Sequence, residues 1–189
     1  MRPPLRCWRV YPHDPTAVPG APFTATWIHP GQTAGRFDLQ NRPPVLYLAE
    51  TAEHAVGEVL QGFRGRRIGP AHLRRHGHPL ALVSVLLGDD LSTRLSDLTD
   101  PATLALFGIR PDALASHERR TTQAIARELH ARGEPGFRWW SSLTGAWHGV
   151  VLFADRLGGA DLAIGDPETL AIDHPAVATA AALLGIARA

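Results

Sequence analysis

Two tryptophans and two serines stand side by side within residues 136–156, which read GFRWWSSLTGAWHGVVLFADR. The apolar run GVVLF in this stretch is typical of a buried strand. Trp139 and Trp140 either stack on a flat ring or pack in the core, because each indole has a large apolar surface and an N–H that needs a partner. Ser141 and Ser142 lie outside a G-x-S-x-G elbow, which argues against a serine hydrolase and favours a hydrogen-bonding role. We interpret the stretch as the wall of a pocket.

A glutamate and a histidine share the polar side of a helix predicted over residues 51–63. Its apolar residues follow the i, i+3, i+4, i+7 spacing, and Thr51 is a suitable N-cap. Glu58 lies off the apolar stripe, one turn after His54. On the preceding strand, Tyr47 stands between two leucines, so alternation turns its side chain away from theirs. Tyr47 and Glu58 can therefore edge one cleft, although a solvated glutamate is the simpler interpretation of this helix alone.

An arginine stands between glycine and phenylalanine in GRFD, residues 35–38, within a region rich in proline and glycine. The planar fork of a guanidinium is suited to a bidentate grip on phosphate or carboxylate. A loop arginine is more often simply solvated, so the role of Arg36 depends on the residues that accompany it.

Residues 64–78, RGRRIGPAHLRRHGH, form a basic run. The net charge of the whole chain is only +1, and the run has no interleaved aromatic residues for base stacking, so we expect no direct binding of nucleic acid. We expect a solvated or flexible loop. His72, His76 and His78 are spaced loosely like metal ligands, but the arginines beside them repel cations, so we expect no metal site.

The elements that must position these residues alternate between strand-like and helix-like patterns. Strands are expected at residues 7–11, 23–27, 45–50, 80–87, 149–155 and 161–165, and helices at 51–63, 100–108, 117–132 and 174–189. This alternation indicates a mixed fold of helices and strands, without the glycine fingerprint of a Rossmann unit.

Length and composition favour one compact domain over residues 1–189. The chain is 44% hydrophobic and has no repeat or linker. The single cysteine, Cys7, excludes an internal disulfide and favours a reducing compartment. The N-terminal stretch has prolines and arginines where a signal peptide is apolar, and no segment is long and apolar enough to span a membrane, so we expect a cytoplasmic protein.

Taken in order, GRFD, PPVLYLAE with AVGEVL, and GFRWWSS with GVVLF resemble the RES-domain family, which is named for an arginine, a glutamate and a serine. The resemblance extends from about Trp8 to Phe153. Carried over by position, the family's arginine, tyrosine, glutamate and serine fall on Arg36, Tyr47, Glu58 and Ser141.

The chain departs from the family pattern in two places. FD follows the arginine where the family often has Trp-Asn, and WW precedes the serine where the family usually has a pair like Tyr-Pro. The second departure leaves the choice between Ser141 and Ser142 open.

The resemblance implies an α+β fold: an ADP-ribosyltransferase-like core of two small β-sheets with flanking helices around a cleft that binds NAD. It implies a toxin of a toxin–antitoxin pair, with an Xre-like antitoxin as its partner. Such a toxin degrades NAD by splitting the bond between nicotinamide and ribose, by hydrolysis or by phosphorolysis. NAD is then a substrate, phosphate a possible second substrate, and no metal is needed.

The residue types fit that reaction. Loss of nicotinamide leaves an oxocarbenium-like ribose, whose positive charge the carboxylate of Glu58 can stabilise. Arg36 can neutralise the pyrophosphate, Tyr47 and Trp139 can stack on the nicotinamide ring, and Ser141 can hydrogen-bond NAD.

Two other functions fit parts of the sequence. An ADP-ribosyltransferase would use the same cleft to modify a macromolecule. A non-catalytic module would use the arginines of residues 64–75 to hold nucleic acid.

Overall fold

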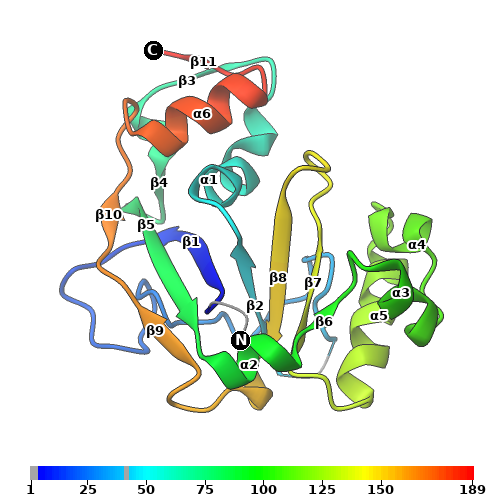
Figure 1. Ribbon diagram of the computed structural model, residues 1–189. Coiled ribbons are helices and arrows are strands. Elements are labelled where there is room, and N and C mark those ends of the chain that lie inside the picture. Colours follow the sequence, from blue (N-terminus) through cyan, green and yellow to red (C-terminus); the bar gives the residue numbers. More distant parts are fainter. Residues whose placement is uncertain (1–3, 41–42) are drawn as a thin grey trace. The chain divides into compact units, whose positions relative to one another are not determined.

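The computed structural model describes residues 4–40 and 43–189 and contains both helices and strands, as expected for an α+β fold (Figure 1). Residues 1–3 of the N-terminal stretch discussed above lie outside this description. The chain divides into two compact units. The first unit takes the described residues of Met1–Leu5, Ile28–Leu48 and Leu87–Leu162, and the second takes Arg6–Trp27, Ala49–Leu86 and Ala163–Ala189. Among the described residues, no helix is both long and apolar enough to cross a membrane.

The strands of the first unit follow the order β2-β8-β7-β6. Their bounds are β2 (Val45–Ala49, whose last residue belongs to the second unit), β8 (His148–Phe153), β7 (Gly136–Trp140) and β6 (Ser96–Asp97). Strands β7 and β8 are antiparallel, with Trp139 opposite Gly149. Glycine is required at position 136, because a Cβ there would lie 2.2 Å from the carbonyl oxygen of Val151.

Helices cover the strands of the first unit and bury leucines with them. They are α2 (Asp89–Arg94), α3 (Pro101–Phe107), α4 (Pro111–Ala115) and α5 (Arg119–Ala131), with a 3-10 turn at Ala154–Arg156. Asp100 caps α3 by accepting hydrogen bonds from the N–H groups of Ala102 and Thr103. The core contains Phe37, Phe137, Phe153, Leu98, Leu104, Leu114, Leu129 and Val151.

The strands of the second unit follow the order β10-β5-β1, and β4 and β9 also pair with β5. Their bounds are β1 (Arg6–Pro12), β5 (His78–Leu87), β10 (Glu168–Thr169), β4 (Arg74–Arg75) and β9 (Leu162–Ile164, whose first residue belongs to the first unit). Strands β1 and β5 are antiparallel from Arg6 opposite Leu86 to Pro12 opposite Leu80. A separate parallel pair joins β3 (Arg67–Ile68) to β11 (Ala187–Arg188).

Two helices of the second unit, α1 (Ala52–Leu60) and α6 (Pro175–Leu183), pack against each other, and α1 also contacts β1. The predicted cap of α1 is confirmed, because the Thr51 side chain accepts a hydrogen bond from the His54 N–H at 3.2 Å. Short 3-10 turns lie at Gln61–Phe63 and Pro70–Leu73. The core includes Val56, Leu60, Val177, Ala180 and Leu82.

The strand predicted at residues 23–27 is wrong. The segment makes turns, and Phe23 has a φ of 68°, which a strand residue does not adopt. The partly buried side chain of Arg9 donates hydrogen bonds to the carbonyls of Ala25 and Trp27, which a neighbouring strand would otherwise pair with. Burial lowers the pKa of Arg9 to about 10, which still leaves it charged at neutral pH.

Two other segments also differ from expectation. The basic run at residues 64–78, expected as a loop, contains β3, a 3-10 turn and β4, because buried Ile68 and Leu73 anchor it to the core. The helix expected to reach residue 189 ends at Leu183, and Gly185 adopts a φ of 66° before β11 begins.

Candidate functional site

Residues 35–38 of the first unit form a loop closed by the buried carboxylate of Asp38. Its Oδ2 accepts a hydrogen bond from the Gly35 N–H at 2.6 Å, and its Oδ1 accepts one from the Tyr47 hydroxyl at 2.7 Å. The Tyr47 hydroxyl accepts the Phe37 N–H at 2.9 Å. A Cβ at position 35 would lie 2.4 Å from Asp38 Oδ1 and 2.6 Å from the Tyr47 oxygen, so glycine is required there. GRFD and Tyr47 therefore form one hydrogen-bonded group.

Tyr47 faces the core of the first unit together with Val45. Leu46 and Leu48 are buried but do not belong to that core, which agrees with the predicted alternation along β2. Burial and the adjacent Asp38 carboxylate raise the pKa of Tyr47 well above its ordinary value. Tyr47 is therefore a neutral phenol with a fixed ring orientation.

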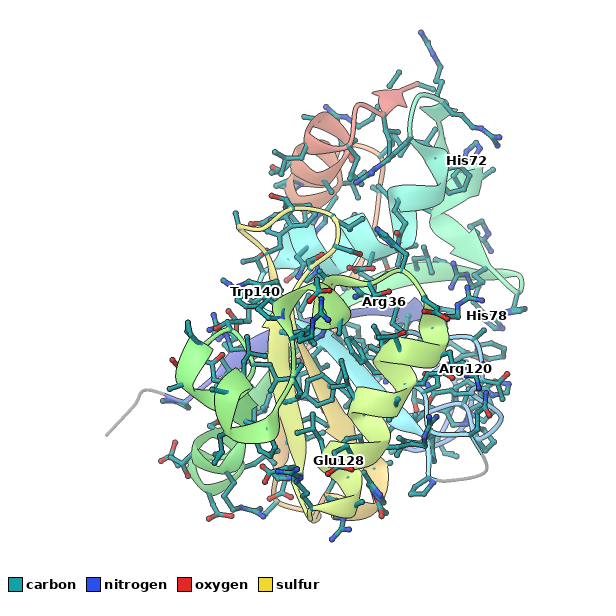
Figure 2. All side chains as sticks on the ribbon, turned by 90° about the vertical axis from the view of Figure 1, so that its right-hand side faces the viewer. Arg36, His72, His78, Arg120, Glu128 and Trp140 are labelled. Carbon is teal, nitrogen blue, oxygen red and sulfur yellow. The ribbon has the colours of Figure 1, made fainter. Side chains whose placement is uncertain are left out.

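Arg36 lies against an aromatic surface and a turn of backbone. Its Nη2 donates hydrogen bonds to the carbonyls of Leu114 at 2.7 Å and Ser116 at 3.0 Å. The guanidinium carbon lies 4.6 Å from the Trp139 ring centroid and 5.3 Å from that of Phe37, as in cation–π contacts. Figure 2 labels Arg36 among the side chains of this region. The arginine joins GRFD to β7 and to the segment that leaves α4.

Two buried polar residues of α5, which the sequence analysis did not select, also hold the loop. The hydroxyl of Thr122 donates to the carbonyl of Arg36, and the side-chain amide of Gln123 donates to the carbonyls of Thr33 at 3.2 Å and Gly35 at 2.9 Å. They are 0% and 3% exposed. The helical periodicity of the sequence could have placed these two polar residues on the inner face of α5. That pattern was the available sequence signal for them.

Trp139 is buried within β7, and its indole nitrogen has no acceptor in the part of the chain that the structure describes. Gly149 opposite it leaves room for the ring, because a Cβ there would lie 2.7 Å from Nε1. An unpaired buried donor costs about 1–3 kcal/mol, so such a group calls for an explanation, and one explanation is a ligand acceptor. The part of the predicted pocket wall at Gly136–Trp140 is thus strand β7, and its Trp139 contacts Arg36.

The two serines after β7 differ in burial. Ser141 is 6% exposed, its N–H donates to the Trp147 carbonyl at 2.8 Å, and its Oγ accepts from the Leu143 N–H at 3.1 Å. Ser142 is exposed. Of the pair, Ser141 is the one fixed at the end of the strand that carries Trp139.

Glu58 belongs to the second unit, where side chains of its own helix and of the adjoining turn hold both carboxylate oxygens. His54 Nε2 lies 3.1 Å from Oε1, and the Gln61 side chain donates to Oε2 at 2.9 Å. The His54 side chain is 2% exposed and that of Glu58 is 38% exposed. The predicted proximity of His54 and Glu58 is confirmed, but the histidine is buried rather than on a solvated face.

The structure thus brings together Arg36, Tyr47 and Trp139 in the first unit, with Ser141 two residues beyond Trp139. Glu58 lies in the second unit with its own partners, and its participation with the other four stays a prediction. Among the described residues, no group of three or more His, Cys, Asp or Glu side chains is arranged to hold a metal ion.

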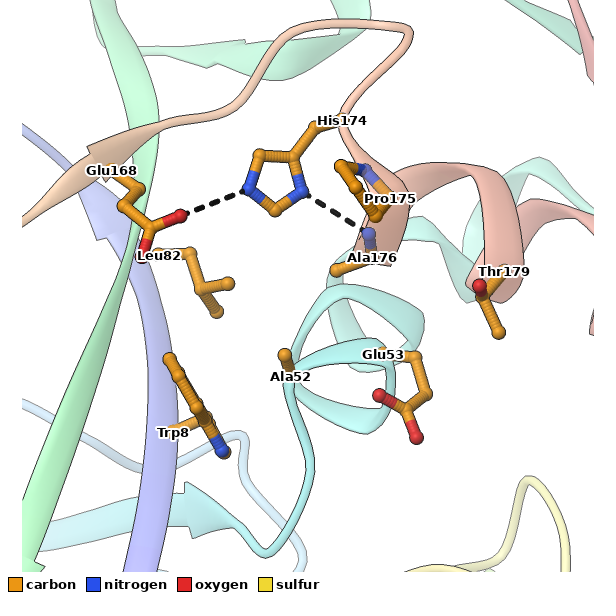
Figure 3. Close-up of a pocket in the computed structure, with 9 residues that line it drawn as sticks. All are labelled: Trp8, Ala52, Glu53, Leu82, Glu168, His174, Pro175, Ala176 and Thr179. Carbon is orange, nitrogen blue, oxygen red and sulfur yellow. Dashed lines mark hydrogen bonds and ion pairs between the residues drawn. The ribbon is translucent and has the colours of Figure 1, made fainter.

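A pocket of about 350 Å³ in the second unit contains none of these predicted residues (Figure 3). It lies between the sheet and the first turns of α1 and α6, and its lining includes Trp8, Leu82 and Glu53. His174 spans its rim, accepting the Ala176 N–H at 3.1 Å through Nδ1 and facing Glu168 at 3.4 Å through Nε2.

The protein has an α+β fold. A family model described as the RES domain matches residues 6–173, and the chain belongs to the RES-domain family. Among solved structures, it is similar in fold to one described as the MbcT–MbcA toxin–antitoxin complex of M. tuberculosis. That match has 19% sequence identity and a TM-score of 0.64, and it covers 95% of this chain and 88% of the other. No curated protein matches the chain.

Proposed function

We propose that the protein is an NAD-degrading toxin that cleaves the bond between nicotinamide and ribose. The main support for the proposal is that Arg36, Tyr47 and Trp139 lie close together in a chain of the RES-domain family. The buried indole N–H of Trp139 also lacks an acceptor among the described residues. The proposal includes an ADP-ribosyltransferase-like core whose cleft binds NAD.

In the proposed reaction, the bond between C1 of the ribose and N1 of nicotinamide breaks, and its electron pair neutralises the pyridinium. The ribose becomes oxocarbenium-like, and the Glu58 carboxylate stabilises this charge. An oxygen of water or of phosphate then bonds to C1, and attacking water loses a proton. The contacts from His54 and Gln61 support this role, because they fix the orientation of the carboxylate before the charge develops.

The other residues are proposed to bind NAD. Arg36 has a charged, planar group for the pyrophosphate, and its contacts with two carbonyls hold that group in place. Tyr47 and Trp139 are the aromatic residues proposed to contact the nicotinamide, and Ser141 is the residue proposed to hydrogen-bond NAD through its hydroxyl.

We also propose an antitoxin partner of the Xre type. The similar structure is described as a toxin–antitoxin complex, and a protein that drains NAD would harm its own cell without an inhibitor. Expression with and without the neighbouring gene tests this, since harmless accumulation of folded, NAD-cleaving protein would contradict it.

Incubation of the purified protein with NAD alone tests the reaction. We expect loss of NAD with release of nicotinamide, accompanied by ADP-ribose if water is the acceptor. If phosphate is the acceptor, the reaction needs added phosphate and yields ADP-ribose phosphorylated at C1. Consumption of NAD only after a cell extract is added, with label transferred to protein or nucleic acid, would instead indicate an ADP-ribosyltransferase.

A further inference from the structure

Six arginines of the second unit form what we call the arginine surface: Arg64, Arg66, Arg67, Arg74, Arg75 and Arg188. All six are exposed. The first five lie within twelve residues of sequence, and Arg188 joins them because β11 pairs with β3, with Arg188 opposite Ile68. His72, labelled in Figure 2, marks the segment, from which nitrogen-tipped side chains project.

The backbone under this surface is held in place. Ile68 and Leu73 are 0% and 2% exposed, and they directly follow Arg67 and directly precede Arg74, respectively, in the sequence. The Ala187 N–H donates to the Arg66 carbonyl at 3.0 Å, and the Ala189 N–H donates to the Ile68 carbonyl at 2.8 Å. The arginines are therefore presented from a fixed framework, which lowers the entropy cost of binding a partner.

No carboxylate neutralises the arginine surface within the described residues. Residues 61–88 contain no aspartate or glutamate. Elsewhere in the chain, Arg94, Arg110 and Arg132 each pair with an acidic residue two to four positions away. Arg74 and Arg188 do make hydrogen bonds, but to the carbonyls of Gly77 and Ile172, which leave their charge uncompensated. The surface is thus a local concentration of positive charge in a chain whose net charge is only +1.

The chemistry around the surface favours an acidic polypeptide over nucleic acid. Two nearby phenylalanine rings already contact histidine rings rather than lying open for base stacking. The ring centroids of Phe63 and His72 lie 5.0 Å apart, edge to face, and those of Phe23 and His78 lie 4.3 Å apart, stacked. The arginines of residues 64–75 lie on two-residue strands and turns, so no recognition helix carries them. Guanidinium groups form bidentate pairs with carboxylates, and a few such pairs suffice for a short acidic segment.

We propose that the arginine surface docks an acidic segment of a partner protein. Identification of that partner as the antitoxin rests on the proposed function, whereas the surface itself does not. Failure of NAD cleavage and failure of acidic-peptide binding are therefore separate results.

Fluorescence anisotropy with labelled peptides tests the proposal. The probe is a short peptide of alternating glutamate and alanine, its control has glutamine in place of glutamate, and the nucleic-acid probe is a single-stranded DNA of the same net charge. The protein variants are R66E/R67E and R74E/R75E, with R74Q/R75Q as a milder change. The matched control is R119E/R120E, which reverses two exposed arginines of the first unit and alters the net charge equally.

We expect the protein to bind the glutamate peptide, more weakly as salt increases, and not the glutamine peptide. Each reversal on the arginine surface should weaken binding by about tenfold or more, whereas R119E/R120E should change it less than about threefold. Equal losses in the control variant, or no binding of the glutamate peptide, would overturn the proposal. Tighter binding of the DNA, lost with the same variants, would assign the surface to nucleic acid.

Discussion

At the scale of single residues, Glu58 carries the proposed chemistry and His54 determines how its carboxylate is presented. A buried imidazole 3.1 Å from one carboxylate oxygen restricts rotation of a side chain that is otherwise 38% exposed. Gln61 restrains the second oxygen. We infer that His54 is a positioning residue for the proposed reaction.

Replacement of His54 by phenylalanine should therefore lower kcat for NAD cleavage by about tenfold, because the ring volume remains while the hydrogen bond to Glu58 is lost. KM should change little. His54→Gln keeps an N–H donor and should restore much of the loss. Equal activity of the folded phenylalanine variant and the wild type, or no rescue by glutamine, would contradict a positioning role.

Arg36 contributes a planar group that lysine cannot replace. Its two hydrogen bonds to backbone carbonyls and its contact with Trp139 depend on the guanidinium plane. Arg36→Lys should lower both NAD affinity and the free energy of unfolding, the latter by about 1–3 kcal/mol. Chemical denaturation and NAD titration measure the two effects. Arg94→Lys, at an exposed ion pair with Asp90, is the control and should change neither. Unchanged stability and affinity in Arg36→Lys would show that the contacts around Arg36 do not matter.

At the scale of elements, the loop of residues 35–38 is held by β2, β7 and α5 at once. Its shape depends on glycine at position 35, where the space for a Cβ is already occupied by Asp38 and Tyr47. Gly35→Ala should destabilise the protein by about 1–3 kcal/mol and reduce NAD cleavage. The matched control is Gly145→Ala in the same unit, where a Cβ would meet nothing within 4 Å. Thermal unfolding distinguishes them, and equal melting temperatures would refute the packing argument.

The elements differed in how far the sequence predicted them. Helix α1 was predictable because its apolar spacing and the Thr51 cap are local properties of the chain. The strand expected at residues 23–27 failed because its β-type composition says nothing about Arg9, which takes the carbonyls of Ala25 and Trp27. Residues 136–140 were interpreted as a pocket wall rather than a strand. Their pairing with β8 depends on the turn that joins the two strands, which the composition of residues 136–140 does not indicate.

The candidate site was predictable in its residue types but not in its contacts. The motif resemblance selected Arg36 and Tyr47, and the paired indoles before the two serines indicated Trp139. The structure places these three residues together. The carbonyls that receive Arg36 belong to Leu114 and Ser116, about eighty residues away, and no local pattern indicates such a contact. Thr122 and Gln123 were missed because periodicity can place them on the inner face of α5 but does not indicate their partners, which are backbone groups of a distant loop.

At the scale of the whole molecule, the proposed roles are divided between the two units. Arg36, Tyr47, Trp139 and Ser141 belong to the first unit, and Glu58 belongs to the second. The proposed reaction depends on both residues, so the variants of Arg36 and Glu58 should lower the same NAD-cleaving activity. The arginine surface lies in the second unit and has no assigned role in that reaction.

The most direct test of the central claim compares NAD consumption by the wild type, Glu58→Gln and Glu53→Gln, each confirmed as folded by circular dichroism. Glu58→Gln keeps the size of the side chain but removes the negative charge that faces the developing cation, an effect of about 3–4 kcal/mol, or at least a hundredfold in rate. Glu53→Gln makes the same change five residues earlier on α1, at a residue with no proposed role. We expect steady NAD loss by the wild type and Glu53→Gln, and almost none by Glu58→Gln. Near wild-type turnover by folded Glu58→Gln, or no NAD loss by the wild type with or without phosphate, would contradict the central claim.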